Sequence, residues 1–194
     1  MRLIALFALI VALAIPAQAD TYQFRKYGFM FDGPAGWKVL SARDMKRFTD
    51  NTDYGSREIN DYIRSRDPNL LLLIADTNSG FGVKPGIHIF VRDGRGDDPQ
   101  AYVAAVADAM GQNVRNFRLI EGATPDQIGE YAATRFAAGY VVLSAGIRLD
   151  VVDVAWVVPL GDRHLLISSG TAPDDAKGIA EVRAAVETLR RVDD

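Results

Sequence analysis

Two histidines, His88 and His164, are the only side chains of this chain whose ordinary pKa lies near neutral pH. Each falls in an apolar run that predicts a β-strand. In Ile87-His88-Ile89-Phe90, the alternation places His88 on the face of Phe90 and opposite the two isoleucines. Two histidines beside a carboxylate could bind zinc or copper. A half-buried structural role fits each one better, and nothing in the sequence brings them together.

Nucleophilic catalysis finds little support in the sequence. The stretch Val142-Leu143-Ser144-Ala145-Gly146 lacks the first glycine of the Gly-x-Ser-x-Gly elbow. Ser168-Ser169 end a predicted strand, and cysteine is absent, which excludes thiolate nucleophiles and zinc–thiolate sites. We therefore expect a chain that is not an enzyme, and we predict no catalytic residue.

An acidic loop offers the clearest candidate for cation binding. Asp93-Gly94-Arg95-Gly96-Asp97-Asp98 holds three carboxylates within six residues, as a calcium site could. The loop lacks the spacing of a calcium-binding loop, Arg95 would oppose the bound charge, and Asp98 is better explained as a helix cap before Pro99. Asp93 and Asp97 remain the candidate metal ligands, and we predict no resident cofactor.

A glycine-rich loop follows the apolar run Leu70–Ala75. Gly80-Phe81-Gly82-Val83-Lys84-Pro85-Gly86 fits neither a dinucleotide fingerprint nor a Walker loop, because Pro85 interrupts it and a strand follows. Such a loop could form a lip over a groove, with Phe81, Lys84 and His88 as candidate ligand-binding residues. A plain connection between two strands explains the same residues.

The N-terminus has the pattern of a secretory signal peptide. Met1-Arg2 is a short positive region, Leu3–Ile15 is apolar throughout, and Pro16-Ala17-Gln18-Ala19 ends in small residues at the expected cleavage position. We predict a signal peptide over 1–19 and one domain over 20–194, located in the periplasm or outside the cell. An uncleaved N-terminal anchor is the alternative.

Charge gives no sign of a nucleic-acid or membrane partner. The chain has 22 Lys and Arg against 25 Asp and Glu, for a net charge of −3, and the two signs are interspersed. This pattern predicts no nucleic-acid binding and, once the signal peptide is removed, no stable membrane insertion.

The elements that must position these residues follow from hydrophobic periodicity. A helix capped by Ser41 begins a broken helical region, a second helix runs from Asp98 to Gly111, and a third from about Asp174 to Arg191. The predicted strands are Gln23–Phe31, Trp37–Leu40, Leu70–Ala75, Ile87–Val91, Phe117–Glu121, Gly129–Ala138, Ile147–Val158 and His164–Ser169. The last four are joined by short turns and predict an antiparallel meander.

The corner between the first two predicted strands reads Asp32-Gly33-Pro34-Ala35-Gly36 and is followed by Trp37. We predict that Pro34 and Gly36 turn the chain back in a hairpin, and that Trp37 packs into the core. These three residues are therefore assigned structural roles.

With these residues in order, the chain resembles the PsbP-like and DcrB-like proteins, whose fold is shared with Mog-type Ran-binding proteins. The resemblance is carried by Phe31-Asp32-Gly33-Pro34-Ala35-Gly36-Trp37-Lys38, Asp98–Tyr102, Phe117–Glu121, Ile128–Ala132 and Gly161–Leu165. It implies an α+β fold in which an antiparallel sheet of about six to eight strands is covered by helices, as an α/β/α sandwich.

The same resemblance implies a function without catalysis. Members of the family generally present a surface to a partner, and they share no single site. We therefore expect an exported accessory or protein-interaction domain of the bacterial cell envelope, with a protein partner that the sequence does not identify. The alternative is a periplasmic module that binds a small ligand or a metal.

Overall fold

A computed structural model describes residues 19–65, 71–75, 82–94 and 98–192. The strands are β1 (Thr21–Phe24), β2 (Phe29–Asp32), β3 (Trp37–Val39), β4 (Thr52–Asp53), β5 (Leu71–Ala75), β6 (Gly86–Asp93), β7 (Arg118–Ile128), β8 (Tyr131–Ser144), β9 (Ile147–Leu160), β10 (Arg163–Thr171) and β11 (Arg190–Arg191). The helices are α1 (Ala42–Asp50), α2 (Arg57–Ser65), α3 (Pro99–Asn113) and α4 (Ala176–Val186), with a 3-10 turn at Arg25–Tyr27.

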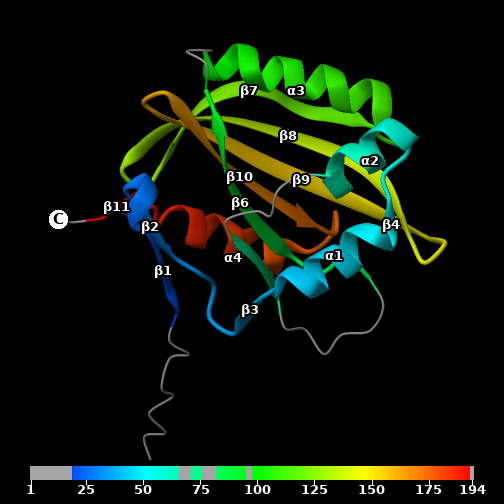
Figure 1. Ribbon diagram of the computed structural model, residues 1–194, viewed down its shortest axis with the longest axis horizontal. Helices are drawn as coiled ribbons and strands as arrows, with labels where there is room; N and C mark the ends of the chain where they lie inside the picture. Colours follow the sequence, from blue (N-terminus) through cyan, green and yellow to red (C-terminus); the bar gives the residue numbers. More distant parts are fainter. Residues whose placement is uncertain (1–18, 66–70, 76–81, 95–97, 193–194) are drawn as a thin grey trace, which may run out of the picture.

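An eight-stranded sheet forms the centre of the molecule. Its strand order is β3-β5-β6-β10-β9-β8-β4, β7 also pairs with β8, and every pairing is antiparallel. A separate three-stranded sheet has the order β1-β2-β11. The α+β class, the antiparallel sheet and the meander from β7 to β10 are as the sequence predicts (Figure 1).

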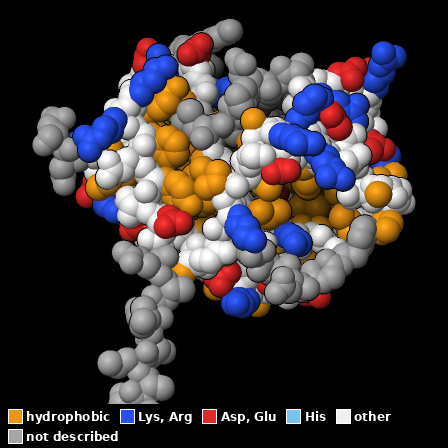
Figure 2. Space-filling model, turned by 60° about the horizontal axis from the view of Figure 1, so that its bottom comes forward, with side chains coloured by type: hydrophobic (Ala, Val, Ile, Leu, Met, Phe, Trp, Pro, Cys, Tyr) orange, Lys and Arg blue, Asp and Glu red, His pale blue; other side chains and the backbone are white. Residues whose placement is uncertain are grey.

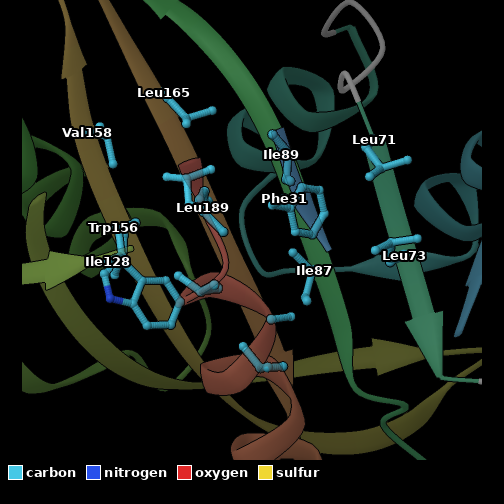
Figure 3. Close-up of a cluster of buried hydrophobic side chains, with 14 of the residues drawn as sticks. Phe31, Leu71, Leu73, Ile87, Ile89, Ile128, Trp156, Val158, Leu165 and Leu189 are labelled. Carbon is cyan, nitrogen blue, oxygen red and sulfur yellow. The ribbon is translucent and has the colours of Figure 1, made fainter. Parts of the chain in front are cut away.

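One face of the large sheet holds the main hydrophobic core. Alternating side chains of β5, β6, β9 and β10 point toward α4 and the small sheet, and Phe31 and Leu189 close the layer (Figure 3). Phe29, Leu73, Ile87, Leu165 and Leu189 have no solvent exposure. The other face is covered by α3, whose Val103 lies in a second, smaller cluster with Phe136, Ala138, Ala155, Val157 and Leu166.

Two helix starts are placed where the sequence predicts them. The Ser41 hydroxyl accepts a hydrogen bond from the Asp44 N–H at 3.1 Å at the start of α1. The Asp98 carboxylate accepts one from the Gln100 N–H at 3.2 Å, and Pro99 is the first residue of α3. The prediction that α3 ends at Gly111 is wrong, since the helix continues to Asn113.

The predicted first strand, Gln23–Phe31, is in fact two strands. The chain turns at Arg25–Tyr27, and Gly28 adopts a φ of 75°, so β2 returns antiparallel to β1. The rings of Phe24 and Phe29 stack with their centroids 4.8 Å apart across the pair. The stretch predicted as one strand therefore contains a hairpin, because Gly28 supplies the left-handed residue that the turn needs.

The Pro34–Gly36 corner does not close a hairpin, and that prediction is wrong. It carries the chain from β2 in the small sheet to β3 in the large one, with Gly36 at a φ of 77°. Trp37 is 7% exposed, lies in the main core, and its indole N–H donates to Glu181 Oε2 at 3.2 Å.

The C-terminal helix is shorter than predicted. It ends at Val186, and β11 then pairs with β2, so Arg190 and Arg191 are not helical. Leu189 is fully buried in the connection, whereas Ile179 within the helix is 41% exposed. The chain leaves the helix early because Leu189 fills the core beneath the small sheet.

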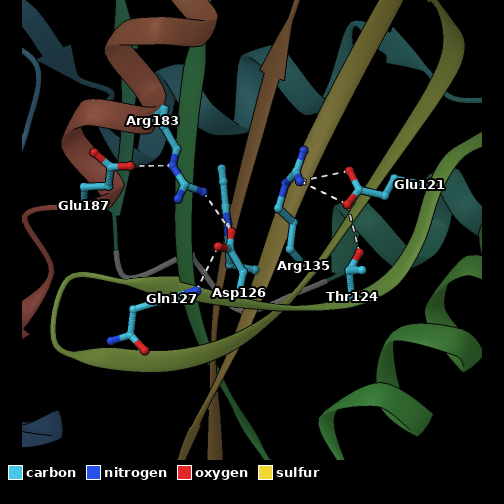
Figure 4. Close-up of polar contacts among 8 residues, drawn as sticks. Glu121, Thr124, Asp126, Gln127, Arg135, Arg183 and Glu187 are labelled. Carbon is cyan, nitrogen blue, oxygen red and sulfur yellow. Dashed lines mark hydrogen bonds and ion pairs between the residues drawn. The ribbon is translucent and has the colours of Figure 1, made fainter.

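One ion pair, between Arg183 and Asp126, fixes the β7–β8 hairpin to α4, and further pairs lie on either side of it (Figure 4). Arg183 donates to Asp126 Oδ2 at 2.8 Å and to Glu187 Oε1 at 2.6 Å. Burial alone would raise the pKa of Asp126, but hydrogen bonds from Arg183, the Trp156 indole and the Gln127 backbone outweigh it and lower the pKa to about 2. A second pair, Arg135 and Glu121, joins the two strands of the hairpin at 2.9 Å.

The predicted signal peptide lies almost wholly outside the described residues. Within the residues that the structure describes, no helix is long and apolar enough to cross a membrane.

Candidate ligand-binding cavity

A cavity of about 770 Å³ lies between the large sheet and the helices α1, α2 and α3. Its walls are mainly apolar: Met45 and Phe48 from α1, Ile59 and Ile63 from α2, Val106 and Met110 from α3, and Leu72, Phe90, Phe136, Ala155, Val157 and Leu166 from the sheet. Hydrophobic side chains reach the molecular surface in two areas of one face, with Lys and Arg side chains beside them (Figure 2). A separate hollow along α1 is lined by Ser41, Asn51 and charged residues only, so it offers no apolar wall.

The cavity exists because the amphipathic helices α1 and α2 do not seal against the sheet. None of the residues of α1 is buried, and Phe48 is 42% exposed. The helix packs on α2 and on β4, and its apolar side lines the cavity. Apolar surface that would ordinarily be buried is thus left facing a hollow.

Hydrogen bonds to Asn113 and Asp53 hold α2 beside the end of α3. The Ser56 hydroxyl donates to Asn113 Oδ1 at 3.0 Å, and the Ser56 N–H donates to the Asn113 carbonyl at 2.9 Å. Asp53 accepts from the Asn60 amide at 2.7 Å and from Arg115 at 3.1 Å. These contacts fix the segment that carries Tyr54 into the cavity wall.

Four polar side chains cross the cavity floor, one from each of four neighbouring strands. They are Tyr140 on β8, Asp153 on β9, Ser168 on β10 and His88 on β6. Ser168 lies directly opposite His88, while Tyr140 and Ser168 lie diagonally on either side of Asp153. The Ser168 hydroxyl donates to the Asp153 carboxylate, with oxygen–oxygen distances of 2.9 and 3.1 Å, and the Tyr140 hydroxyl donates to it as well.

The floor is surrounded by protein, and this shifts the pKa of each of its titratable groups. Burial raises the pKa of Asp153 to about 6, against the effect of the hydrogen bonds from Ser168, the Ser169 backbone and Tyr140. Burial lowers the pKa of His88 to about 4. Burial and the neighbouring Asp153 charge raise the pKa of Tyr54 to about 12 and that of Tyr140 well above its ordinary value. All four retain some exposure because they face the cavity.

The candidate ligand-binding residues from the sequence are not brought together at this site. His88 lines the cavity, on the face of Phe90. Lys84 is exposed and is not part of the lining, and Phe81 lies outside the described residues. A shared site of Phe81, Lys84 and His88 stays a prediction. Of the two described residues, His88 lines the cavity and Lys84 does not.

The candidate metal ligands are also separated from the cavity. Asp93 is exposed at the end of β6, opposite Arg163, and Asp97 lies outside the described residues. Across the described ranges, no group of three or more His, Asp or Glu side chains could hold a metal ion.

The two histidines lie apart on the same face of the sheet. His164 is 3% exposed, and its ring meets that of Tyr102 edge-on, with the centroids 5.3 Å apart. His164 pairs with Arg92, four residues along β6 from His88, which separates the two by roughly 13 Å along the strand.

Sequence reasoning missed Asp153 and its neighbours. A signal was present, since Asp153 interrupts the apolar alternation of Val151-Val152-Asp153-Val154-Ala155 on the side of Val151 and Ala155. A carboxylate at a core-facing strand position costs free energy unless it is paired, so its presence points to a special environment.

Comparisons with known proteins support the fold. No family model matches the chain, and no curated protein matches it either. Among solved structures, the cyanobacterial PsbP protein CyanoP from Synechocystis aligns over 96% of this chain and 99% of its own, with 14% identity and a TM-score of 0.52. LpqN, a protein involved in cell envelope biogenesis in Mycobacterium tuberculosis, aligns over 88% of this chain and 84% of its own, with 12% identity and a TM-score of 0.51.

A longer protein from Bacteroides thetaiotaomicron aligns over 91% of this chain at 12% identity, with a TM-score of 0.52. This chain spans half of that protein's length. The chain therefore has the PsbP-like fold that its sequence resembles, and at these identities the likeness speaks for the fold alone.

Proposed function

We propose that this chain is an exported, non-catalytic domain that binds a small and largely apolar molecule in the cavity beneath α1, α2 and α3. The observation that carries the proposal is the cavity itself. The sequence favours a protein-interaction domain, with ligand binding as the alternative. Because of the cavity, we prefer ligand binding.

Packing argues that the hollow is built for an occupant. Protein interiors are close-packed, and voids larger than a water molecule are few. A volume of about 770 Å³ is within the range of small-molecule sites, which are mostly apolar with a few fixed polar groups. The wall formed by Met45, Phe48, Ile59, Val106 and Met110 has this composition.

The arrangement of the floor supports a role without catalysis. In a hydrolytic triad, the histidine stands between the carboxylate and the serine, so that it can take the serine proton. Here the Ser168 hydroxyl donates directly to Asp153. Its proton is held by the carboxylate, and a role in fixing the shape and charge of the floor fits this geometry better.

Export and an envelope role are parts of the same proposal. The predicted signal peptide would deliver residues 20–194 to the periplasm or the outside. The fold is shared with LpqN, which acts in envelope biogenesis. A protein partner would then deliver or receive the bound molecule. Mass spectrometry of the exported protein tests the first step: we expect Asp20 at the N-terminus, and a retained Met1 would contradict cleavage.

Binding of an uncharged naphthylamine fluorophore tests the cavity. We expect the purified protein to bind it saturably with one site. Ala109→Trp should fill the cavity from α3 and weaken binding at least tenfold, because Ala109 lines it. Ala104→Trp is the matched control: both alanines are exposed on α3, but Ala104 is not part of the cavity lining. Failure of the unmodified protein to bind, or equal binding by the Ala109 variant, would refute the proposal.

A further inference from the structure

We propose that the ligand carries a protonated amine, which binds Asp153 at the cavity floor while its hydrocarbon part lies between the helices and the sheet. The inference rests on the proposed function and names the class of ligand: an amphiphile with an ammonium group.

The charge of the floor is the first argument. Asp153 has three hydrogen-bond donors, namely Ser168, Tyr140 and the Ser169 backbone. A carboxylate has about four lone-pair positions, so it can accept a further donor. Within the described part of the chain, none of the groups that lower its pKa is a lysine or an arginine. These donors stabilise the carboxylate but carry no positive charge, so its negative charge is left uncompensated.

The groups that face the floor do not supply the missing charge. His88 on β6, Tyr140 on β8 and Tyr54 in the β4–α2 connection face the floor, and burial shifts the pKa of each toward its neutral form. From α3, Tyr102 adds a phenol ring. The charged groups of the lining are on α1 and α2: Lys46, Glu58 and Arg64. All three are exposed, so their charges lie on the solvent side of the cavity, and Lys46 pairs with Asp50 at 2.7 Å.

Filling the cavity then decides which ligand is preferred. An apolar occupant displaces the water that hydrates Asp153, and a dry carboxylate is costly unless it is paired or protonated. An alkylammonium ion supplies both a positive charge and N–H donors. An alcohol supplies a donor alone, and a carboxylate would add a second negative charge. Charge complementarity thus predicts that the amine binds most tightly, the alcohol less tightly and the acid most weakly.

Three probes of equal chain length test this order: decylamine, decanol and decanoate, each competing with the naphthylamine fluorophore at pH 7.5. We expect decylamine to bind at least tenfold more tightly than decanol, and decanoate to bind most weakly. Asp153→Asn should remove the preference for decylamine without weakening decanol binding, because the neutral amide is less costly to dry than the carboxylate. Asp150→Asn is the matched control, because Asp150 is exposed on the same strand and pairs with Arg148.

A pH series on the unmodified protein keeps the test independent of any variant. Lowering the pH from 7.5 to 5 should weaken decylamine binding severalfold as Asp153 takes up a proton, and should leave decanol binding equal or tighter, because a protonated floor is less costly to dry. Equal affinities for amine and alcohol, tightest binding of decanoate, or an amine preference that survives Asp153→Asn would overturn the inference and leave the proposed function standing. Failure of all three probes and the fluorophore to bind would overturn the proposed function itself.

Discussion

The cavity floor predicts that Asp153→Asn and His88→Gln change the pH dependence of stability in opposite directions. Burial raises the pKa of the Asp153 carboxyl to about 6, and it lowers the pKa of the His88 imidazole to about 4. Each neutral form is therefore favoured by folding. The two groups titrate over overlapping ranges of pH, and their effects on the free energy of unfolding have opposite signs. Each effect should therefore become visible only when the other group is removed.

For Asp153 the folded pKa lies above the unfolded value of about 3.9. The folded state binds the proton more tightly, so the contribution to stability is complete below pH 4 and is lost as the pH rises through about 6. At 1.36 kcal/mol for each pKa unit, the loss between pH 4 and pH 7 is about 3 kcal/mol.

For His88 the sign is reversed, because the folded pKa of about 4 lies below the unfolded value of about 6.5. The contribution is complete above pH 6.5 and is lost as the pH falls through about 4, and it also amounts to about 3 kcal/mol. Between pH 4 and 6.5 the two slopes nearly cancel in the unmodified protein.

Urea unfolding from pH 4 to 8 is the assay. Asp153→Asn should become more stable by about 3 kcal/mol as the pH rises from 4 to 7, and His88→Gln should become less stable by a similar amount. The test compares how the free energy of unfolding changes with pH, and not its value at one pH, because each substitution also alters hydrogen bonding. If the change in the free energy of unfolding between pH 4 and pH 7 stays within about 1 kcal/mol of the parent's change for both variants, the floor is well hydrated and the reasoning about its burial fails.

Three further predictions concern the framework and can be read by urea unfolding. Trp37→Ala should cost about 3–5 kcal/mol, as for other buried aromatic residues, and a loss below about 1 kcal/mol would contradict its placement in the core. Gly129→Ala should cost at least about 2 kcal/mol more than Gly146→Ala. Both glycines have positive φ, but only at Gly129 would a Cβ collide with the Leu189 carbonyl, so equal losses would refute the close approach. Asp126→Asn should cost about 2 kcal/mol above pH 4 and progressively less as the pH falls through about 2, because the ion pair stabilises only the ionised carboxylate and so lowers its pKa. A cost that stays constant over this range would contradict the ion pair.

Local sequence signals were enough for much of the fold. The caps at Ser41 and Asp98 depend on neighbours two or three residues away, and both were predicted. The meander from β7 to β10 follows from alternation and short turns, which are also local. What these signals could not give was pairing between distant segments: β10 lies between β6 and β9, and β11 joins β2 from the other end of the chain.

The candidate site was beyond the reach of local patterns for the same reason. Tyr140, Asp153, Ser168 and His88 are spread over some eighty positions of the chain and meet only through the strand order β6-β10-β9-β8. The sequence singled out His88, which is rare and titratable, and passed over Asp153, one of 25 acidic residues. Besides His88, the local trace of the site was the interruption of an apolar alternation by one carboxylate.

The two faces of the sheet differ in how they are closed, and this difference supports the proposed function. Toward α4, the small sheet and Leu189 complete a dry layer in which Phe29, Leu73 and Ile87 have no exposure. On the opposite face, α3 covers β7, β8 and β9, while α1 and α2 cover the remainder without burying any residue of α1. A dry layer over Asp153 would leave a buried, unpaired carboxylate, which is costly, and this supports our proposal that a ligand of matching charge completes the second face.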